Sequence, residues 1–350
     1  MADLSTVGKI KKIKCVVWDL DNTLWDGVLL EDNQVKPRRE VLTIIRILDE
    51  RGILQSIASK NNYEIAMGKL EELGINEYFL YPQINWNSKS SSVKNIAQSL
   101  NIGINTFAFV DDQQFELDEV KFSIPEVRCI NIEELDSLAD RPDMIPDFIT
   151  ADSKNRRYMY LSDQKRKRDE EEFNGPQEEF LASLGMTFTI SPVGEGDLER
   201  AEELSVRTNQ LNSTGYTYSY DELKEFSKSN KYKVMIAALD DKYGTYGKIG
   251  LSLVECDGNK WTIKLLLMSC RVMSRGVGTV MLNYIMNLAI EQGATLYAEF
   301  VSNDRNRMMY ITYKFAGFNE VLKEGDWVVF ECGIKDIQKF PDYIKVNLIS

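Results

Sequence analysis

The stretch that most limits the fold is an apolar run followed by two acids, near the start of the chain. Residues 13–18 are mostly β-branched or apolar, and Asp19-Leu20-Asp21-Asn22-Thr23 follows directly. A short run of this composition predicts a buried strand that ends in a loop. Two carboxylates that lie together and are partly desolvated are costly unless a cation or a phosphate reaction requires them. Such a pair is also common in turns, so its meaning depends on residues downstream.

Polar side chains follow two further predicted strands in the first half of the chain. One strand ends at Ser59-Lys60 and the other at Asp111-Asp112, and Lys89 opens a helix between them. Strands that alternate with helices predict a parallel, doubly wound sheet, in which ligands bind at the carboxyl ends of the strands. Two acid pairs, a hydroxyl and a lysine at this edge are the groups that metal-dependent phosphoryl transfer needs.

Composition restricts the chemistry further. The 350 residues include no histidine, which excludes Ser-His-Asp and Cys-His catalysis and any histidine-bound metal. The net charge of −12 makes the chain a poor general binder of nucleic acid, so we expect no nucleic-acid partner. We find no apolar run of membrane-spanning length and no signal peptide, so we expect a cytoplasmic protein with no membrane partner. Five scattered cysteines without a C-x-x-C pair predict free thiols.

The length of the chain fits two domains, and Pro142 and Pro146 indicate a boundary near residue 150. The charged run Lys165-Arg166-Lys167-Arg168, followed by Asp169-Glu170-Glu171-Glu172, favours a solvated helix with paired charges. A docking patch for an acidic protein is the alternative. We predict four segments, which are a first domain at 1–148, a charged helical linker at 149–180, a second domain at 181–335 and a C-terminal tail at 336–350.

The most informative stretch of the second half joins a strand to a helix through two glycines. The predicted strand ends at Met268, and Arg275-Gly276-Val277-Gly278 opens the helix. Free amides and the helix dipole at such a junction favour an anion such as phosphate. Cys270 lies between the strand and this loop, beside Arg271, and a neighbouring cation favours a thiolate. For the other four cysteines, which lie in apolar runs, we expect core packing: Cys15, Cys129, Cys256 and Cys332.

The polar groups of the first half resemble the four motifs of the haloacid dehalogenase (HAD) superfamily of phosphotransferases. The resemblance implies that Asp19 is the nucleophile, that Asp21 is the general acid and base, and that Lys89 stabilises the charge. Between Asp21 and Ser59 the chain has room only for a hairpin at Trp25–Asn33 and one helix, so no large cap domain is expected. The residues implied to bind phosphate are Ser59, Lys60 and Thr23, and those implied to hold Mg²⁺ are Asp19, Asp111, Asp112 and, through its main-chain carbonyl, Asp21.

The element order of the second half resembles the GCN5-related N-acetyltransferase (GNAT) fold. The glycine loop is similar to the pyrophosphate loop of that fold, and Asn306 with Tyr313-Lys314-Phe315-Ala316-Gly317-Phe318 is similar to its closing helix. The GNAT loop normally has Gly or Ala where Val280 stands, which favours phosphopantetheine on a carrier protein over free acetyl-coenzyme A. The residues that we expect to bind substrate or phosphate here are Arg271, Arg275, Gly276, Gly278 and Asn306.

The predicted fold class is therefore α/β, with an N-terminal HAD-like Rossmannoid parallel sheet without a large cap and a C-terminal GNAT-like α/β domain. This combination resembles the FkbH-like family, also called HAD subfamily IIIC. Trp86, Asn209-Gln210-Leu211-Asn212 and Ser269-Cys270-Arg271 are further matches. The resemblance implies a glyceryl transferase/phosphatase that takes 1,3-bisphosphoglycerate and, with Mg²⁺, removes a phosphate. It would load the glyceryl group on the phosphopantetheine arm of an acyl carrier protein, for polyketide-type biosynthesis.

Two points stay open at the level of sequence. Cys270 would carry the acyl group between the acyl phosphate and the carrier, but direct attack by the carrier thiol is the alternative. The alternative function for the whole chain is an Mg²⁺-dependent HAD phosphatase fused to an ordinary acetyl-coenzyme A-dependent acetyltransferase.

Overall fold

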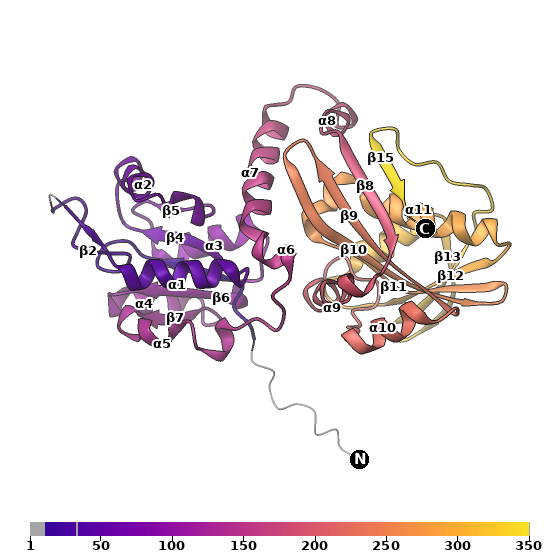
Figure 1. Cartoon of the computed structure of the whole chain (residues 1–350), viewed down its shortest axis with the longest axis horizontal. Coiled ribbons are helices and arrows are strands. Elements are labelled where there is room, and N and C mark those ends of the chain that lie inside the picture. Colours follow the sequence, from indigo (N-terminus) through magenta and orange to yellow (C-terminus); the bar gives the residue numbers. More distant parts are fainter. Residues whose placement is uncertain (1–10, 33, 350) are drawn as a thin grey trace, which may run out of the picture. The chain divides into compact units, whose positions relative to one another are not determined.

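The structure is a computed structural model that describes residues 11–32 and 34–349. The chain divides into two compact units, Met1–Leu161 and Ser162–Ser350, and each has its own sheet with helices packed on it (Figure 1). Both units are α/β, as predicted. No helix in the described part of the chain is both long and apolar enough to cross a bilayer. The four predicted segment limits stay predictions, and residues 1–10, Asn33 and Ser350 lie outside the described residues.

The first unit contains a parallel five-stranded sheet in the order β5-β4-β1-β6-β7. The apolar run predicted as a buried strand forms β1, which pairs with β4 on one side and β6 on the other. All four β1 residues are buried, as expected of a central strand covered on both faces. The strands are β1 (Cys15–Trp18), β4 (Leu54–Ser59), β5 (Gln83–Ile84), β6 (Phe107–Asp111) and β7 (Arg128–Asn131).

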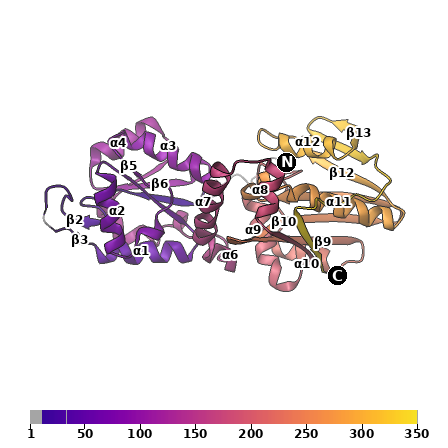
Figure 2. The same cartoon turned by 90° about the horizontal axis from the view of Figure 1, so that it is seen from above.

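Helices cover both faces of this sheet. Figure 2 shows α3 and α4 on one side of it and α1 on the other. Side chains alternate along β1, so Val16 and Trp18 join one apolar cluster and Cys15 and Val17 join another. The helices are α1 (Arg39–Glu50), α2 (Tyr63–Glu72), α3 (Lys89–Leu100), α4 (Gln114–Ser123), α5 (Leu135–Leu138) and α6 (Ala151–Lys154).

The hairpin after β1 is longer than predicted. Its strands are β2 (Trp25–Asp26) and β3 (Lys36–Pro37), so the second strand begins beyond the predicted limit at Asn33. Gly27 follows β2 with φ of +101°, a backbone conformation that glycine adopts without strain. The chain between Asp21 and α1 is thus a short ribbon with no room for a cap domain.

The second unit contains a mixed eight-stranded sheet in the order β13-β14-β12-β11-β10-β9-β8-β15. The pairs β11–β12 and β15–β8 are parallel, and the other pairs are antiparallel. Part of the predicted C-terminal tail forms a strand, β15. Its residues Ile344–Leu348 pair with β8. The strands are β8 (Met186–Pro192), β9 (Tyr232–Asp241), β10 (Gly244–Asp257), β11 (Lys260–Met268), β12 (Thr295–Val301), β13 (Phe318–Glu324), β14 (Trp327–Cys332) and β15 (Ile344–Leu348).

Helices also pack on both faces of the second sheet. Buried residues of α11 and α12 belong to one apolar cluster, and those of α9 and α10 belong to another. A capping box opens α10, since the side chains of Ser219 and Glu222 each bond to the other's backbone. The helices are α8 (Gln177–Ser183), α9 (Leu198–Arg207), α10 (Tyr220–Lys228), α11 (Val277–Glu291) and α12 (Arg307–Phe315).

The charged run lies on α7 (Arg156–Glu172), which contains the division between the units. The prediction of a solvated face is wrong for Arg166, which is fully buried in the second unit. Its guanidinium group pairs with both carboxylate oxygens of Asp241, at 2.7 and 2.8 Å, and stacks 3.7 Å from the ring of Tyr246. A charge buried in this way requires such pairing. The neighbouring Lys165 and Lys167 are exposed.

The parallel strands β11 and β12 separate along their length. Their pairing ends at Ile263 and Ala298, and Ser213 lies in the gap beyond. The Ser213 amide donates to the Leu266 carbonyl at 3.0 Å, and its carbonyl accepts from the Val301 amide at 3.0 Å. A residue from the connection between α9 and α10 therefore completes the hydrogen bonding between two strands of the sheet.

Candidate active site

The predicted motifs of the first unit meet at the carboxyl edge of its sheet. Asp19 follows β1, Ser59 ends β4 and Asp111 ends β6. These strands are parallel neighbours in the order β4-β1-β6, so their last residues lie side by side. All three side chains are buried. The sheet topology thus gathers side chains that are far apart in the sequence.

Lys89, the first residue of α3, places its ammonium group between two carboxylates. Its Nζ contacts Asp19 Oδ1, lies 3.0 Å from Asp111 Oδ2 and donates to the Ala58 carbonyl at 2.9 Å. Only 4% of the residue is exposed. Burial lowers the pKa of Lys89, but the two carboxylates outweigh it and hold the pKa above its ordinary value. Lys89 is therefore charged at neutral pH and offsets part of the negative charge of the site.

Three donors fix the side chain of Asp21. Trp25 Nε1 and the Leu29 amide donate to Oδ1 at 2.8 and 3.0 Å, and Asn61 Nδ2 donates to Oδ2 at 3.0 Å. Burial raises the pKa of Asp21 above its ordinary value, and the charge of Asp19 adds to this, although the Trp25 and Leu29 bonds oppose it. A carboxyl group with a raised pKa holds a proton closer to neutral pH, which suits a general acid.

Asp19, Asp111 and Asp112 form the one acidic cluster in the described residues that is fit to hold a metal ion, with oxygens within 4.8 Å of one another. Burial, followed by the charge of Asp19, raises the pKa of Asp111 to about 7. Within the described part of the chain, Asp112 Oδ1 is buried without a hydrogen-bond partner. Converging carboxylate oxygens, one of them unsatisfied, fit Mg²⁺. The Asp21 side chain lies outside this cluster. The metal contact predicted for Asp21 is made by its main-chain carbonyl, and it stays a prediction.

The three residues predicted to bind phosphate have different surroundings. Ser59 is buried at the end of β4. The hydroxyl of Thr23 is also buried and has no hydrogen-bond partner among the described residues, which leaves it available to a ligand oxygen. Lys60 pairs with Glu116 at 2.6 Å, so the protein already neutralises its charge. The roles of all three stay predictions.

Asn61 and Trp25 are site residues that the sequence did not indicate. Both donate to the Asp21 carboxylate and so determine where it points. Asn61 lies two residues after Ser59, in the polar run that follows a strand. This position was the only feature of the sequence that could have indicated its place in the site. Trp25 resembles a core residue of the hairpin in sequence, and it is in fact fully buried.

The second predicted site lies where β11 leads into α11. Cys270 is half-buried at the start of a 3₁₀ segment, Cys270–Arg275. Arg271 donates to the Tyr246 carbonyl at 3.0 Å, and the buried Arg275 pairs with Glu170 at 3.1 Å. Each arginine therefore uses part of its hydrogen-bonding capacity on other residues of the protein. The predicted roles of Cys270 and of both arginines stay predictions.

The two loop glycines meet different constraints. Gly276 has φ of +73°, and a Cβ there would meet the hydroxyl of Tyr343, so glycine is strongly favoured at this position. Gly278 lies in the first turn of α11, where a Cβ would meet open space. Val280 is fully buried in the apolar core of this unit. Because the Val280 side chain packs in the core, its identity does not indicate which ligand the glycine loop binds.

Asn306 is fully buried and bonded on all sides to the main chain. Its Nδ2 donates to the carbonyls of Asn212 and Val301 at 3.1 and 2.8 Å, and its Oδ1 accepts from the Asn303 amide at 3.0 Å. These bonds tie loops of the protein together, and its predicted contact with a ligand stays a prediction. Tyr313 on α12, whose position in the closing motif gave no hint of a role, is fully buried, and burial raises the pKa of its hydroxyl above the ordinary value.

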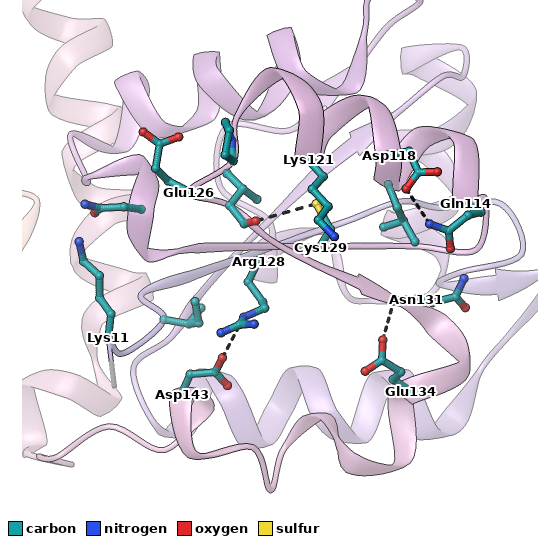
Figure 3. A pocket seen from close by; sticks show the side chains of 15 residues that line it. Lys11, Gln114, Asp118, Lys121, Glu126, Arg128, Cys129, Asn131, Glu134 and Asp143 are labelled. Atoms are coloured by element: carbon teal, nitrogen blue, oxygen red, sulfur yellow. Dashed lines mark hydrogen bonds and ion pairs between the residues drawn. The ribbon is translucent and has the colours of Figure 1, made fainter. Parts of the chain in front are cut away.

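A cavity of about 810 Å³ lies along the edge strand β7 and contains none of the predicted site residues (Figure 3). Its polar side chains pair with one another, as Arg128 does with Asp143 at 3.3 Å and Gln114 with Asp118 at 2.8 Å. Cys129 lines it, and burial raises the pKa of this thiol to about 11. The thiol is therefore protonated at neutral pH.

No protein-family model matches the chain, and no curated protein matches it. Among solved structures, the N-terminal part of BF1531 from Bacteroides fragilis, which contains a phosphatase domain complexed with Mg, is 27% identical. That match covers 43% of this chain and 39% of that chain, with a TM-score of 0.32. This chain thus spans well under half of the BF1531 chain that it matches.

Other similar structures match the second unit. The ribosomal-protein-S18-alanine N-acetyltransferase from Escherichia coli is 15% identical over 41% of this chain and 92% of that chain, with a TM-score of 0.34. The GNAT domain of S. lividans PAT is 17% identical over 41% and 88%, with a TM-score of 0.33. The observed topology defines the class of the protein, which is an α/β chain with one unit built on a parallel five-stranded sheet and another built on a mixed eight-stranded sheet. An acid–lysine cluster occupies the carboxyl edge of the first sheet.

Proposed function

We propose that the first unit is an Mg²⁺-dependent phosphohydrolase that works through an aspartyl-phosphate on Asp19. The observation that carries this proposal is the group of three carboxylates, of which two, Asp19 and Asp111, are buried and contact Lys89 while Asp112 is half-buried. Like charges gathered in this way destabilise a fold unless a ligand needs them. Bound Mg²⁺ would offset the negative charge that a phosphate adds to these carboxylates.

The residues of the site support a two-step reaction. A carboxylate oxygen of Asp19 attacks phosphorus, and the bond between phosphorus and the substrate oxygen breaks as protonated Asp21 donates its proton to that oxygen. Water then attacks the phosphorus of the aspartyl-phosphate and gives a proton to Asp21. Free phosphate leaves, and the Asp19 carboxylate is restored. In this proposal the hydroxyls of Thr23 and Ser59 bind the phosphate oxygens.

For the whole chain, the proposal is a glyceryl transferase/phosphatase that serves an acyl carrier protein. The Cys270 thiolate attacks the acyl-phosphate carbon of 1,3-bisphosphoglycerate and releases one phosphate, which leaves a phosphoglyceryl thioester. The phosphopantetheine thiol of the carrier then attacks the thioester, and the Cys270 thiol is restored. The first unit hydrolyses the remaining phosphate. The resemblance to the FkbH-like family and the position of Cys270 between β11 and α11 support this assignment.

The test is to incubate the protein with Mg²⁺, 1,3-bisphosphoglycerate and a phosphopantetheinylated carrier, and to measure the mass of the carrier. We expect a glyceryl adduct with the wild type, a phosphoglyceryl adduct with Asp19→Asn and no adduct with Cys270→Ala. Cys256→Ala, which removes another half-buried free thiol of the same unit, is the matched control and should behave as the wild type. An unchanged adduct with Cys270→Ala would favour direct attack by the carrier thiol. Acetyl transfer from acetyl-coenzyme A without a carrier would favour the alternative function.

A further inference from the structure

A short segment of the chain fills the space between β11 and β12 of the second unit. The two strands pair only as far as Ile263 and Ala298. Beyond this point residues 211–213 lie between them, and we call these residues the seam segment. The segment belongs to the connection between α9 and α10, and all of it is buried. It lies beside the last residues of β11, which lead directly to Cys270 and the glycine loop.

The seam segment bonds to backbone groups of both strands. The Ser213 amide donates to the Leu266 carbonyl at 3.0 Å, and the Ser213 hydroxyl accepts from the Leu266 amide at 3.0 Å. Further along β11, the Leu211 carbonyl accepts from the Met268 amide at 2.9 Å. On the other side, the Ser213 carbonyl accepts from the Val301 amide at 3.0 Å. The protein itself therefore satisfies groups that the separated strands would otherwise offer to a ligand.

Two buried asparagines hold the seam segment in place. The side chain of Asn306 donates to the carbonyls of Asn212 and Val301 at 3.1 and 2.8 Å, and so ties the segment to β12. The side-chain oxygen of Asn212 accepts from the amides of Thr214 and Gly215 at 3.1 and 2.9 Å, which fixes the turn that follows. Departure of the segment would leave several buried polar groups without partners, and each such group is costly. The segment is therefore a fixed part of the sheet.

Coenzyme A, which the resemblance to the GNAT fold implies as a cofactor of this unit, does not fit this arrangement. With its pyrophosphate at the glycine loop and its thiol near Cys270, its pantetheine arm would extend along the end of β11. The arm carries amide groups, and an extended ligand of this kind binds a strand through free backbone groups at its edge. The backbone groups of β11 at this position already bond to the seam segment. The segment thus occupies the place that the arm requires.

We infer that the seam segment replaces the pantetheine arm of coenzyme A, so that the second unit seats no such arm between β11 and β12. Any arm that brings a thiol or a thioester to Cys270 then approaches from outside the seam. Acetyl-coenzyme A would be held by its nucleotide and phosphate groups alone, which disfavours an ordinary acetyltransferase. The inference concerns the ligand of the second unit and does not depend on the phosphatase proposed for the first.

The first test is calorimetric titration of the full chain with coenzyme A and with 3′-phospho-ADP, the same nucleotide without the arm. We expect the two Kd values to agree within about threefold, or neither ligand to bind. Hydrogen bonds from seated arm amides would instead make coenzyme A bind about tenfold more tightly, or better still. A ratio of that size for the wild type would overturn the inference.

The second test is hydrogen exchange of the amides bonded within the seam, those of Ser213, Leu266 and Met268. In the wild type they should exchange slowly, and at the same rate with and without saturating coenzyme A. Asn306→Ala, which removes the side-chain bonds that anchor the segment, should speed this exchange about tenfold or more. Asn287→Ala is the matched control, because it removes a side-chain bond to the main chain elsewhere in the unit, at 2.9 Å, and should leave the exchange unchanged.

Three results of the exchange experiment would overturn the inference. Faster exchange when coenzyme A is added to the wild type would show that the segment leaves to admit the arm. Exchange in the wild type as fast as that of an exposed loop would show that the segment is not a fixed part of the sheet. Equal exchange in the two variants would contradict the anchoring by Asn306. Neither test measures phosphate release, so the inference and the proposed function can fail separately.

Discussion

Lys89→Met removes the cation that, among the described residues, contacts the buried carboxylates Asp19 and Asp111, and it keeps most of the volume of the side chain. In the wild type, Nζ contacts Asp19 and Asp111 and donates to the Ala58 carbonyl, with only 4% of the residue exposed. Methionine retains the apolar stem and cannot make these bonds. The change therefore tests whether the site is held together by this charge.

The expected loss follows from the burial of the pair. Removing one partner of a buried ion pair destabilises a protein by about 3–5 kcal/mol when the other partner stays charged. Here the carboxylates can take up a proton instead, because the pKa of Asp111 is already raised to about 7. A pKa that is higher in the folded state means that protonation favours folding, so this stability is present at low pH and is lost as the pH rises through the folded pKa. Lys89→Met raises that pKa further.

Urea unfolding with EDTA present measures this directly. We expect the free energy of unfolding of Lys89→Met to lie about 3–5 kcal/mol below that of the wild type near pH 8, and much closer to it near pH 5. Excess Mg²⁺ should recover part of the difference near pH 8, because it replaces the missing positive charge. Lys69→Met, which breaks an exposed surface pair with Glu72, is the control and should cost under about 1 kcal/mol. A Lys89→Met variant as stable as the wild type near pH 8 without metal would refute the reasoning.

Three further predictions concern both units. Asp19→Asn should lower phosphate release about 10³-fold or more while the circular dichroism spectrum stays native, and retention of more than a tenth of the activity would contradict its role as nucleophile. Mg²⁺ at about 100 times its Kd should raise the free energy of unfolding by about 2.7 kcal/mol, and Asp111→Asn should lose most of this in thermal melts with and without EDTA. Gly276→Ala should destabilise the protein by about 1–2 kcal/mol, because residue 276 has a positive φ. Gly278→Ala is the control and should not destabilise it, because a Cβ at residue 278 meets open space. Equal melting temperatures for the two variants would be evidence against a role for the positive φ.

Much of the fold could be predicted because hydrophobic periodicity and turn signals are local. The strand before Asp19 and the helix opened by Lys89 both lie where the sequence places them. The hairpin was predicted to end too early, at Asn33, because its second strand, Lys36–Pro37, has no apolar alternation to mark it. β15 was assigned to a tail because a short strand near the end of a chain is recognised mainly through its partner, here β8.

The site shows the same division between local and long-range information. That Asp19, Ser59 and Asp111 meet follows from a rule about parallel sheets, so sequence reasoning could bring them together. The bond from Asn61 to Asp21 joins residues 40 positions apart, and no local pattern encodes it. Burial of Arg166 was missed for a related reason, since a basic run predicts a solvated face unless a distant acid such as Asp241 is known to pair with it.

The position of Ser213 between β11 and β12 limits how the second unit can be cut. A fragment that begins after residue 215 would retain both strands but would leave the Leu266 carbonyl and the Val301 amide without the partners that Ser213 supplies. An unpaired buried polar group costs about 1–3 kcal/mol, so such a fragment would lack a noticeable share of its folding free energy. The acyl transfer proposed for this unit should therefore be tested in fragments that start upstream of β8, with the connection between α9 and α10 intact.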